Sequence, residues 1–172
     1  MNLQKLFEIQ KELDEHIIIE KGLEGKDLLP EKILSLQVEL GELANELPEV
    51  FKFWSNKKND YNKALVEYCD CLHFILSIGL ELGMDEIADE LDLKKFDFLT
   101  SNTILSCFIG LSYDIADFYY QRENDDMVPY LYEHILLEFA KLGKMLGFTW
   151  DEIEQAYFDK NNINHQRQES GY

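Results

Sequence analysis

The stretch from residue 60 to 82 constrains the fold more than any other part of this chain, because it is almost wholly apolar after its first turn. A helix that is apolar on every side has to be buried nearly all round. Three ionisable residues nevertheless interrupt this stretch: Glu67, Asp70 and His73. A buried acid without a partner costs several kcal/mol, so the fold must supply partners for these two carboxylates.

A second pair of acids lies on the preceding predicted helix, which spans about residues 30–47. Glu39 and Glu42 are three residues apart, as are Glu67 and Asp70. Residues at this spacing share one face of a helix. The two pairs converge if the two helices pack antiparallel.

Four clustered carboxylates cannot all stay ionised without a cation. An all-oxygen set of ligands favours a hard divalent ion, so the pattern indicates Mg²⁺, with Mn²⁺ as the second choice. The alternative is that these are ordinary buried or rim acids satisfied by Lys or Arg. Spacing alone leaves the two interpretations equally good.

Acids three apart are common in this composition, which has 34 Asp and Glu in 172 residues. Roughly seven such pairs are expected by chance. Glu86 with Asp89, and Asp114 with Asp117, show the same spacing. Only the two pairs described above lie on consecutive apolar helices joined by one loop, and this setting singles them out.

The rest of the chain also reads as helices. Three prolines, with few Thr and Val, favour helices over strands. Pro30 suits a first helical turn, Pro48 ends or kinks the helix before it, and Thr149 with Glu152 forms a capping box. The predicted helices span residues 2–20, 30–47, 60–82, 85–95, 100–122 and 128–146, with a last helix after Thr149. We predict an all-α fold, with a four-helix core and accessory helices in one domain of residues 1–172.

A faint internal repeat supports the bundle. Residues 75–87 resemble residues 139–153, since both read as a helix, a glycine stop and a new acidic helix start. Two helical hairpins, once duplicated, would give a four-helix bundle. The second hairpin lacks the paired carboxylates.

Charge and composition exclude several classes of function. The net charge of −18 argues against nucleic acid as a partner. No apolar run is long enough to cross a membrane, and the first residues lack a signal-peptide pattern. The odd count of cysteines, Cys69, Cys71 and Cys107, indicates reduced thiols in the cytoplasm. Alternate residues on a helix diverge by roughly 200°, so Cys69, Cys71 and His73 cannot share one ion, and we predict buried cysteines and a packed histidine.

Two polar groups elsewhere are candidates for ligand binding. Gln10 and Asp14 are four apart on the first predicted helix, either at a solvated edge or as a hydrogen-bonding pair that faces a ligand. Lys160, Asn164 and Arg167 share one face of the last helix. Lys and Arg on one face suit a phosphate chain, although an ordinary solvated helix explains the spacing equally well.

Five segments together resemble a known family. They are residues 10–14 (QKELD), 39–46 (ELGELANE), 51–55 (FKFWS), 67–74 (EYCDCLHF) and 160–168 (KNNINHQRQ). In this order they resemble the dimeric all-α dUTP diphosphatases, especially those of Gram-positive bacteria and their phages. That family belongs to the all-α NTP pyrophosphohydrolase superfamily, which includes MazG. The pattern ExxE followed by ExxD is shared across the superfamily, whereas the closing segment is narrower.

The resemblance implies a homodimeric helical bundle that hydrolyses dUTP, and often dUDP, to dUMP. The Mg²⁺ ligands would be Glu39, Glu42, Glu67 and Asp70, with Glu39 or Glu42 as the general base. Gln10, with Asp14 beside it, would reach the uracil, and Trp54 or Phe53 would line the base pocket. The sugar and phosphates would be held by Lys160, Asn164 and Arg167, with Lys57 or Lys58 as a helper.

Two other functions remain open at this point. One is a broader MazG-like NTP pyrophosphohydrolase with the same metal core. The other is a non-catalytic helical interaction protein whose acids keep the surface soluble. Turnover of a panel of nucleotides with Mg²⁺ separates the three.

Overall fold

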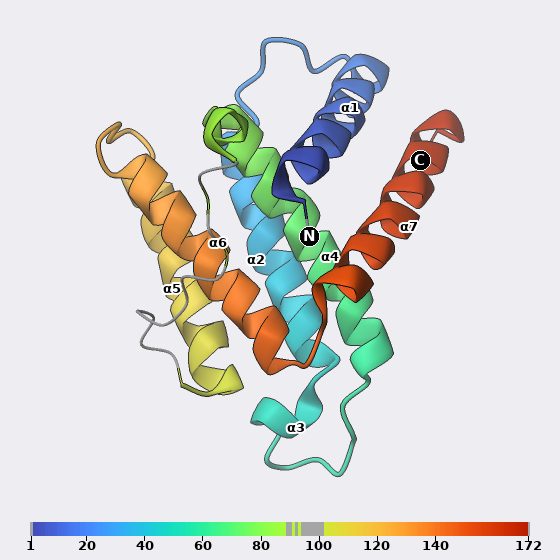
Figure 1. Ribbon diagram of the computed structural model, residues 1–172, viewed down its shortest axis with the longest axis vertical. Coiled ribbons are helices and arrows are strands. Elements are labelled where there is room, and N and C mark those ends of the chain that lie inside the picture. Colours follow the sequence, from blue (N-terminus) through green and yellow to red (C-terminus); the bar gives the residue numbers. More distant parts are fainter. Residues whose placement is uncertain (1, 89–90, 92, 94–101, 172) are drawn as a thin grey trace.

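The computed structural model describes residues 2–88, 91, 93 and 102–171, and within these residues the chain is all-α, as predicted (Figure 1). The elements are α1 (Leu3–Lys21), α2 (Leu29–Asn45), α3 (Pro48–Phe51), α4 (Tyr61–Glu81), the 3₁₀ helix η1 (Met84–Ile87), α5 (Ile104–Gln121), α6 (Val128–Met145) and α7 (Trp150–Glu169).

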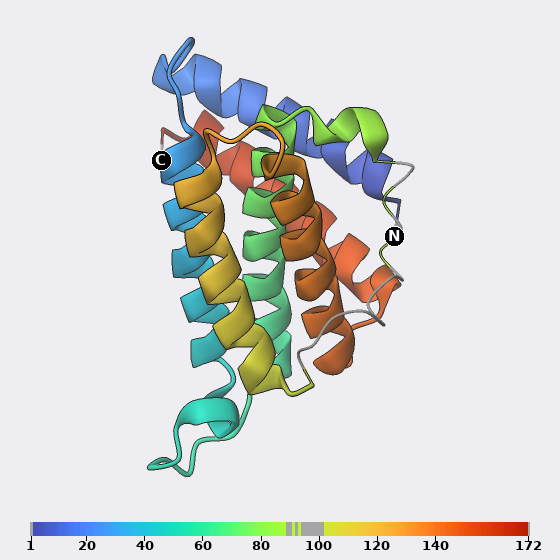
Figure 2. The ribbon, with the colours of Figure 1, turned by 90° about the vertical axis from the view of Figure 1, so that its left-hand side faces the viewer.

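Four long helices form the core, which confirms the predicted architecture. Figure 2 shows α2, α4, α5 and α6 standing roughly parallel, while α1 and α7 cross them at an angle. The antiparallel pairs α2 with α4 and α5 with α6 are the two hairpins, and α2 also packs against α5. The central helix α4 contacts α1, α2, α6 and α7. Both accessory helices therefore lie against the helix that carries the interrupting acids.

The α4 helix is buried along most of its length, as its composition predicts. Its buried residues include Tyr68, Cys69, Cys71, Leu72, Ile75, Leu76 and Ile78. Each fully buried Leu or Ile contributes roughly 1.5–3 kcal/mol relative to exposure. The cysteines are core residues, and none of the three forms a disulfide.

Two reciprocal contacts lock α4 against α6. A Cβ atom on Gly79 would lie 2.3 Å from the Tyr132 hydroxyl oxygen, and one on Gly143 would lie 2.6 Å from the Tyr68 hydroxyl oxygen. Each hydroxyl donates to a carbonyl one turn before the glycine, Tyr132 to Ile75 at 3.0 Å and Tyr68 to Phe139 at 3.1 Å. The two hairpins therefore share one packing device, at the positions where the sequence shows its internal repeat.

Most predicted helix boundaries agree with the structure to within a few residues. The capping box is present, because the Thr149 side chain accepts from the Glu152 amide and the Glu152 carboxylate accepts from the Thr149 amide. Gly83, with φ of 68°, follows the end of α4 in the left-handed conformation that favours glycine. The predicted helix over 85–95 is seen only as η1, and its remainder lies largely outside the described residues.

Among the described residues, no helix combines the length and the apolar character needed to cross a bilayer.

Candidate metal and nucleotide site

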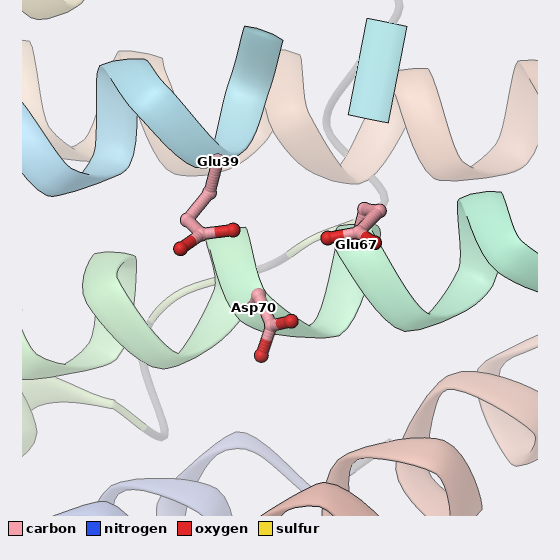
Figure 3. Close-up of side chains that lie close together, drawn as sticks. All are labelled: Glu39, Glu67 and Asp70. Carbon is pink, nitrogen blue, oxygen red and sulfur yellow. The ribbon is translucent and has the colours of Figure 1, made fainter. Parts of the chain in front are cut away.

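Three carboxylates from the first hairpin come together. Glu39 reaches from α2 toward Glu67 and Asp70 on α4 (Figure 3). One oxygen of each lies within 4.8 Å of the others, and all three side chains are half-buried. Glu42 lines the same cavity one turn further along α2, but it stands outside this triplet. The antiparallel packing of α2 and α4 produces the convergence that the spacing predicts.

Without a cation, burial and mutual repulsion make it unfavourable for all three carboxylates to be ionised. Burial, together with the charges of Asp70, Glu42 and Glu67, raises the pKa of Glu39 to about 7. Burial and the charges of Asp70 and Glu42 also raise the pKa of Glu67. Several carboxylate oxygens in a half-buried cluster match the donor set of a hard divalent cation. The residues present therefore fit Mg²⁺.

The α7 helix brings positive charge to this cluster. Lys160 Nζ donates to Asp70 Oδ2 at 2.5 Å. Burial raises the pKa of Asp70, while the hydrogen bond and the charge of Lys160 act in the opposite direction. Asn164 and Arg167, one and two turns further along α7, line the same cavity. The predicted face of α7 is thus turned toward the carboxylates.

One cavity of about 360 Å³ connects these groups with an apolar end. The predicted residues that line it are Gln10, Asp14, Glu39, Glu42, Glu67, Asp70, Lys160, Asn164 and Arg167. The others are Leu13, Ile17, His73, Phe74 and Ser77. The carboxylates and Lys160 form a charged end, and Leu13, Ile17 and Phe74 provide apolar walls. This combination suits a ligand with a polyanionic part and a flat, less polar part.

A hydrogen-bonded network surrounds Gln10, which is only 3% exposed. Its Nε2 donates to Asp14 Oδ1 at 2.7 Å. Its Oε1 accepts from the Tyr157 hydroxyl at 2.7 Å and lies 2.7 Å from His73 Nδ1. The His73 ring stacks on Tyr157 with centroids 4.1 Å apart. Burial and the charge of Lys160 lower the pKa of His73 to about 3, so the ring is neutral.

Asp14 is held from its other side as well. Its Oδ2 accepts from Ser77 Oγ at 2.5 Å and lies 3.4 Å from Lys32 Nζ, which also pairs with Glu81. Sequence reasoning missed the roles of Lys32, Ser77 and Tyr157. Ser77 was detectable, because it lies two turns after Asp70 on the same face of α4.

The aromatic and basic residues after α3 do not reach this cavity. Trp54 and Phe53 are 67% and 96% exposed and contact each other with ring centroids 4.9 Å apart. Lys57 is exposed, and Lys58 pairs with Glu49 instead. None of these four residues lines the cavity within one chain, and their roles in the base and phosphate sites stay predictions. The physical reason is that α3 is only four residues long, so the connection to α4 loops out beyond the end of the bundle (Figure 1).

Comparison with known proteins agrees with this geometry. No curated protein matches the chain. A family model described as dUTPase matches residues 2–172, nearly the whole length. The match includes both carboxylate helices and the α7 face that meets them. The chain therefore belongs to the all-α dUTPase family and is a hydrolase, a dUTP diphosphatase.

Proposed function

We propose that this chain hydrolyses dUTP to dUMP and pyrophosphate, and dUDP to dUMP and phosphate, with Mg²⁺ held by Glu39, Glu42, Glu67 and Asp70. The observation that carries the proposal is the carboxylate triplet, whose oxygens lie within 4.8 Å of one another in a cavity that Lys160 and Arg167 also line. Carboxylates without a cation would repel a triphosphate, and Lys and Arg without carboxylates would bind phosphate but hold no metal.

The ligand set supports Mg²⁺, and Mn²⁺ next, because every candidate ligand is a carboxylate oxygen. When bound, the ion supplies a water of lowered pKa and neutralises charge on the phosphates. Glu42 lines the cavity outside the triplet, so it would be the carboxylate least engaged with the metal and would accept a proton from the attacking water, with Glu39 as the alternative base. Lys160 and Arg167 would stabilise the negative charge that develops on the phosphates.

The apolar end of the cavity supports a base site. Phe74 is half-buried in the cavity wall, where its ring would pack against a base. Gln10 keeps a second amide proton on Nε2 after its bond to Asp14, and that donor suits the O4 acceptor of uracil rather than the amine of cytosine. Asn164 and Arg167 line the α7 wall of the same cavity, where they would hold the sugar and phosphates.

A homodimer forms part of the proposal. Exposed apolar side chains follow one face of α2 and the neighbouring face of α5, and we call this surface the α2–α5 face: Leu34, Val38, Leu105, Ile109, Tyr113 and Tyr120. Leu34 and Tyr120 both line one cavity of about 390 Å³ between these helices, so the two rows adjoin. A contiguous apolar surface of this kind is typical of protein interfaces. A second copy of the chain would cover it.

We place the enzyme in the cytoplasm. All three cysteines are buried and none is in a disulfide, which suits a reducing compartment.

Turnover of dUTP, dUDP, dTTP, dCTP and dATP tests the proposal, each with Mg²⁺, Mn²⁺ or EDTA. We expect dUTP to be preferred, with dUMP and pyrophosphate as products and no activity in EDTA. A preference for dTTP or dCTP would refute it. Even turnover of every nucleotide would indicate a broad MazG-like NTP pyrophosphohydrolase. No turnover and no metal binding would leave a helical interaction protein.

A further inference from the structure

We infer that Asp14 is a positioning residue, which acts through Gln10 to determine which ring nitrogen of His73 carries the proton. His73 would then offer a lone pair to the N3–H group of uracil. This inference rests on the proposed function, because it concerns the choice of base in the same cavity.

The first step is the fixed role of Asp14 as an acceptor. Three donors surround its carboxylate: Gln10 Nε2, Ser77 Oγ and Lys32 Nζ. A carboxylate accepts hydrogen bonds at both oxygens and donates none. Lys32 can only donate, so it holds an oxygen at the Oδ2 position.

The second step is the orientation of the Gln10 amide. Asp14 Oδ1 lies 2.7 Å from one end of this amide, so that end has to be the NH₂ group. A flipped amide would place two acceptor oxygens against each other inside the protein. The carbonyl oxygen of Gln10 therefore faces Tyr157 and His73, and Tyr157 donates to it at 2.7 Å.

The third step is the proton on His73. Its Nδ1 lies 2.7 Å from the Gln10 carbonyl oxygen, which can only accept, so Nδ1 carries the proton. The neutral ring then has a bare lone pair on Nε2. Among the described residues Nε2 has no hydrogen-bond partner, although it is buried and His73 lines the cavity. A buried acceptor without a protein partner points to a ligand that donates.

The consequence is a choice between bases. Uracil carries a proton at N3, whereas cytosine carries a lone pair there. A lone pair on His73 Nε2 would pair with uracil and repel cytosine. The same nitrogen with a proton would favour cytosine.

The hydrogen bonds that run from Asp14 through Gln10 to His73 form what we call the relay. A substitution at Asp14 can reverse their direction. In Asp14→Asn, Lys32 would hold the amide oxygen and leave the NH₂ group facing Gln10, which favours the flipped Gln10. The Tyr157 hydroxyl opposes the flip, because its proton would lose its acceptor. Tyr157→Phe removes that opposition, so the double variant should complete the inversion, while Tyr157→Phe alone should not.

Nuclear magnetic resonance of protein labelled with ¹⁵N-histidine reads the relay directly. We expect the His73 proton on Nδ1 in the wild type, in Tyr157→Phe and in the control Ser77→Ala, which leaves the contact between Asp14 and Gln10 intact. We expect it on Nε2 in Asp14→Asn/Tyr157→Phe. A proton on Nε2 in the wild type, or on Nδ1 in a folded double variant, would overturn the inference.

Kinetics give the second readout. The ratio of kcat/KM for dUTP to that for dCTP should fall about 10- to 100-fold between Tyr157→Phe and the double variant, the effect of one mispaired buried hydrogen bond. A wild type that holds the Nδ1 proton but does not hydrolyse dUTP would refute the proposed function and leave the relay standing. If the double variant carries the His73 proton on Nε2 but keeps the ratio of kcat/KM for dUTP to that for dCTP, His73 does not take part in base selection.

Discussion

Lys160 Nζ lies 2.5 Å from Asp70 Oδ2, although the two residues are 90 positions apart. This contact joins α7 to α4 at the edge of the carboxylate triplet. It brings the charge of Lys160 into the wall of the cavity, where the charge of Arg167 also acts on Asp70. The proposed metal ligands and the proposed phosphate-binding groups thus line one cavity, and each group can be tested separately.

Lys160→Met should lower kcat/KM for dUTP by about 100-fold or more, because a cation directed at developing phosphate charge is lost. Lys63→Met is the matched control, since Lys63 lies on α4 like Asp70 but is exposed and pairs with Asp60 at the surface. Steady-state kinetics with saturating Mg²⁺ measure both. Equal rates in the two variants would contradict a role for Lys160.

Glu67→Gln should abolish turnover and weaken Mg²⁺ binding without unfolding the protein, because it removes one charged ligand but keeps the shape of the side chain. Titration calorimetry with Mg²⁺ and a thermal melt measure the two effects. Glu8→Gln, at an exposed position of α1, is the control. Retained activity in Glu67→Gln would exclude the ligand role.

The stability of the metal-free protein should fall as pH rises from about 4.5 to about 7. In this window folded Glu39 keeps its proton, because its pKa is raised from 4.5 to about 7, while the unfolded chain releases it. The unfolded state therefore binds fewer protons, and the free energy of unfolding decreases with pH.

Denaturation in EDTA at pH 5, 6, 7 and 8 measures this slope. Glu39→Gln should flatten it and should be more stable than the wild type at pH 8 without metal. Mg²⁺ should restore the wild type and have little effect on the variant. If Glu39→Gln is less stable than the wild type at pH 8 without metal, the charge of Glu39 does not destabilise the metal-free fold.

Gly79→Ala should destabilise the fold by roughly 1–3 kcal/mol, because the new methyl group would overlap the ring and hydroxyl of Tyr132. Gly41→Ala is a control that should have the opposite effect, since among the described residues no atom outside its own stretch of helix lies within 4 Å of its Cβ position. It should stabilise α2 by about 0.5–1 kcal/mol. Urea denaturation measures both, and equal effects would contradict the close packing of α4 on α6.

Ile109→Asp should convert a dimer into a monomer, because Ile109 is 64% exposed on the α2–α5 face. Ile19→Asp is matched in chemistry and in exposure, at 66%, but lies on α1. Light scattering coupled to size-exclusion chromatography gives the mass of each. A monomeric wild type, or a dimer that survives Ile109→Asp, would remove this face as the interface.

The sequence by itself determined the features that depend on neighbours along the chain. Thr149 and Glu152 cap a helix because they are three residues apart, and Gly83 ends one because it accepts a positive φ. The same local geometry put Glu67 and Asp70 on one face of α4. Their convergence with Glu39 needed only one further step, the antiparallel packing of two consecutive apolar helices.

Only the tertiary structure decided how distant residues act on one another. Trp54 was expected near the base, but the short α3 leaves it in solvent. Gln10 was expected to face a ligand, but the direction of its amide is set by Asp14 and Tyr157, which folding brings to its two ends. Hydrogen-bond direction depends on atoms brought together by packing, which no spacing along the chain encodes. The carboxylate cluster was therefore visible in the sequence, whereas the direction of the hydrogen bonds around Gln10 was set by the fold.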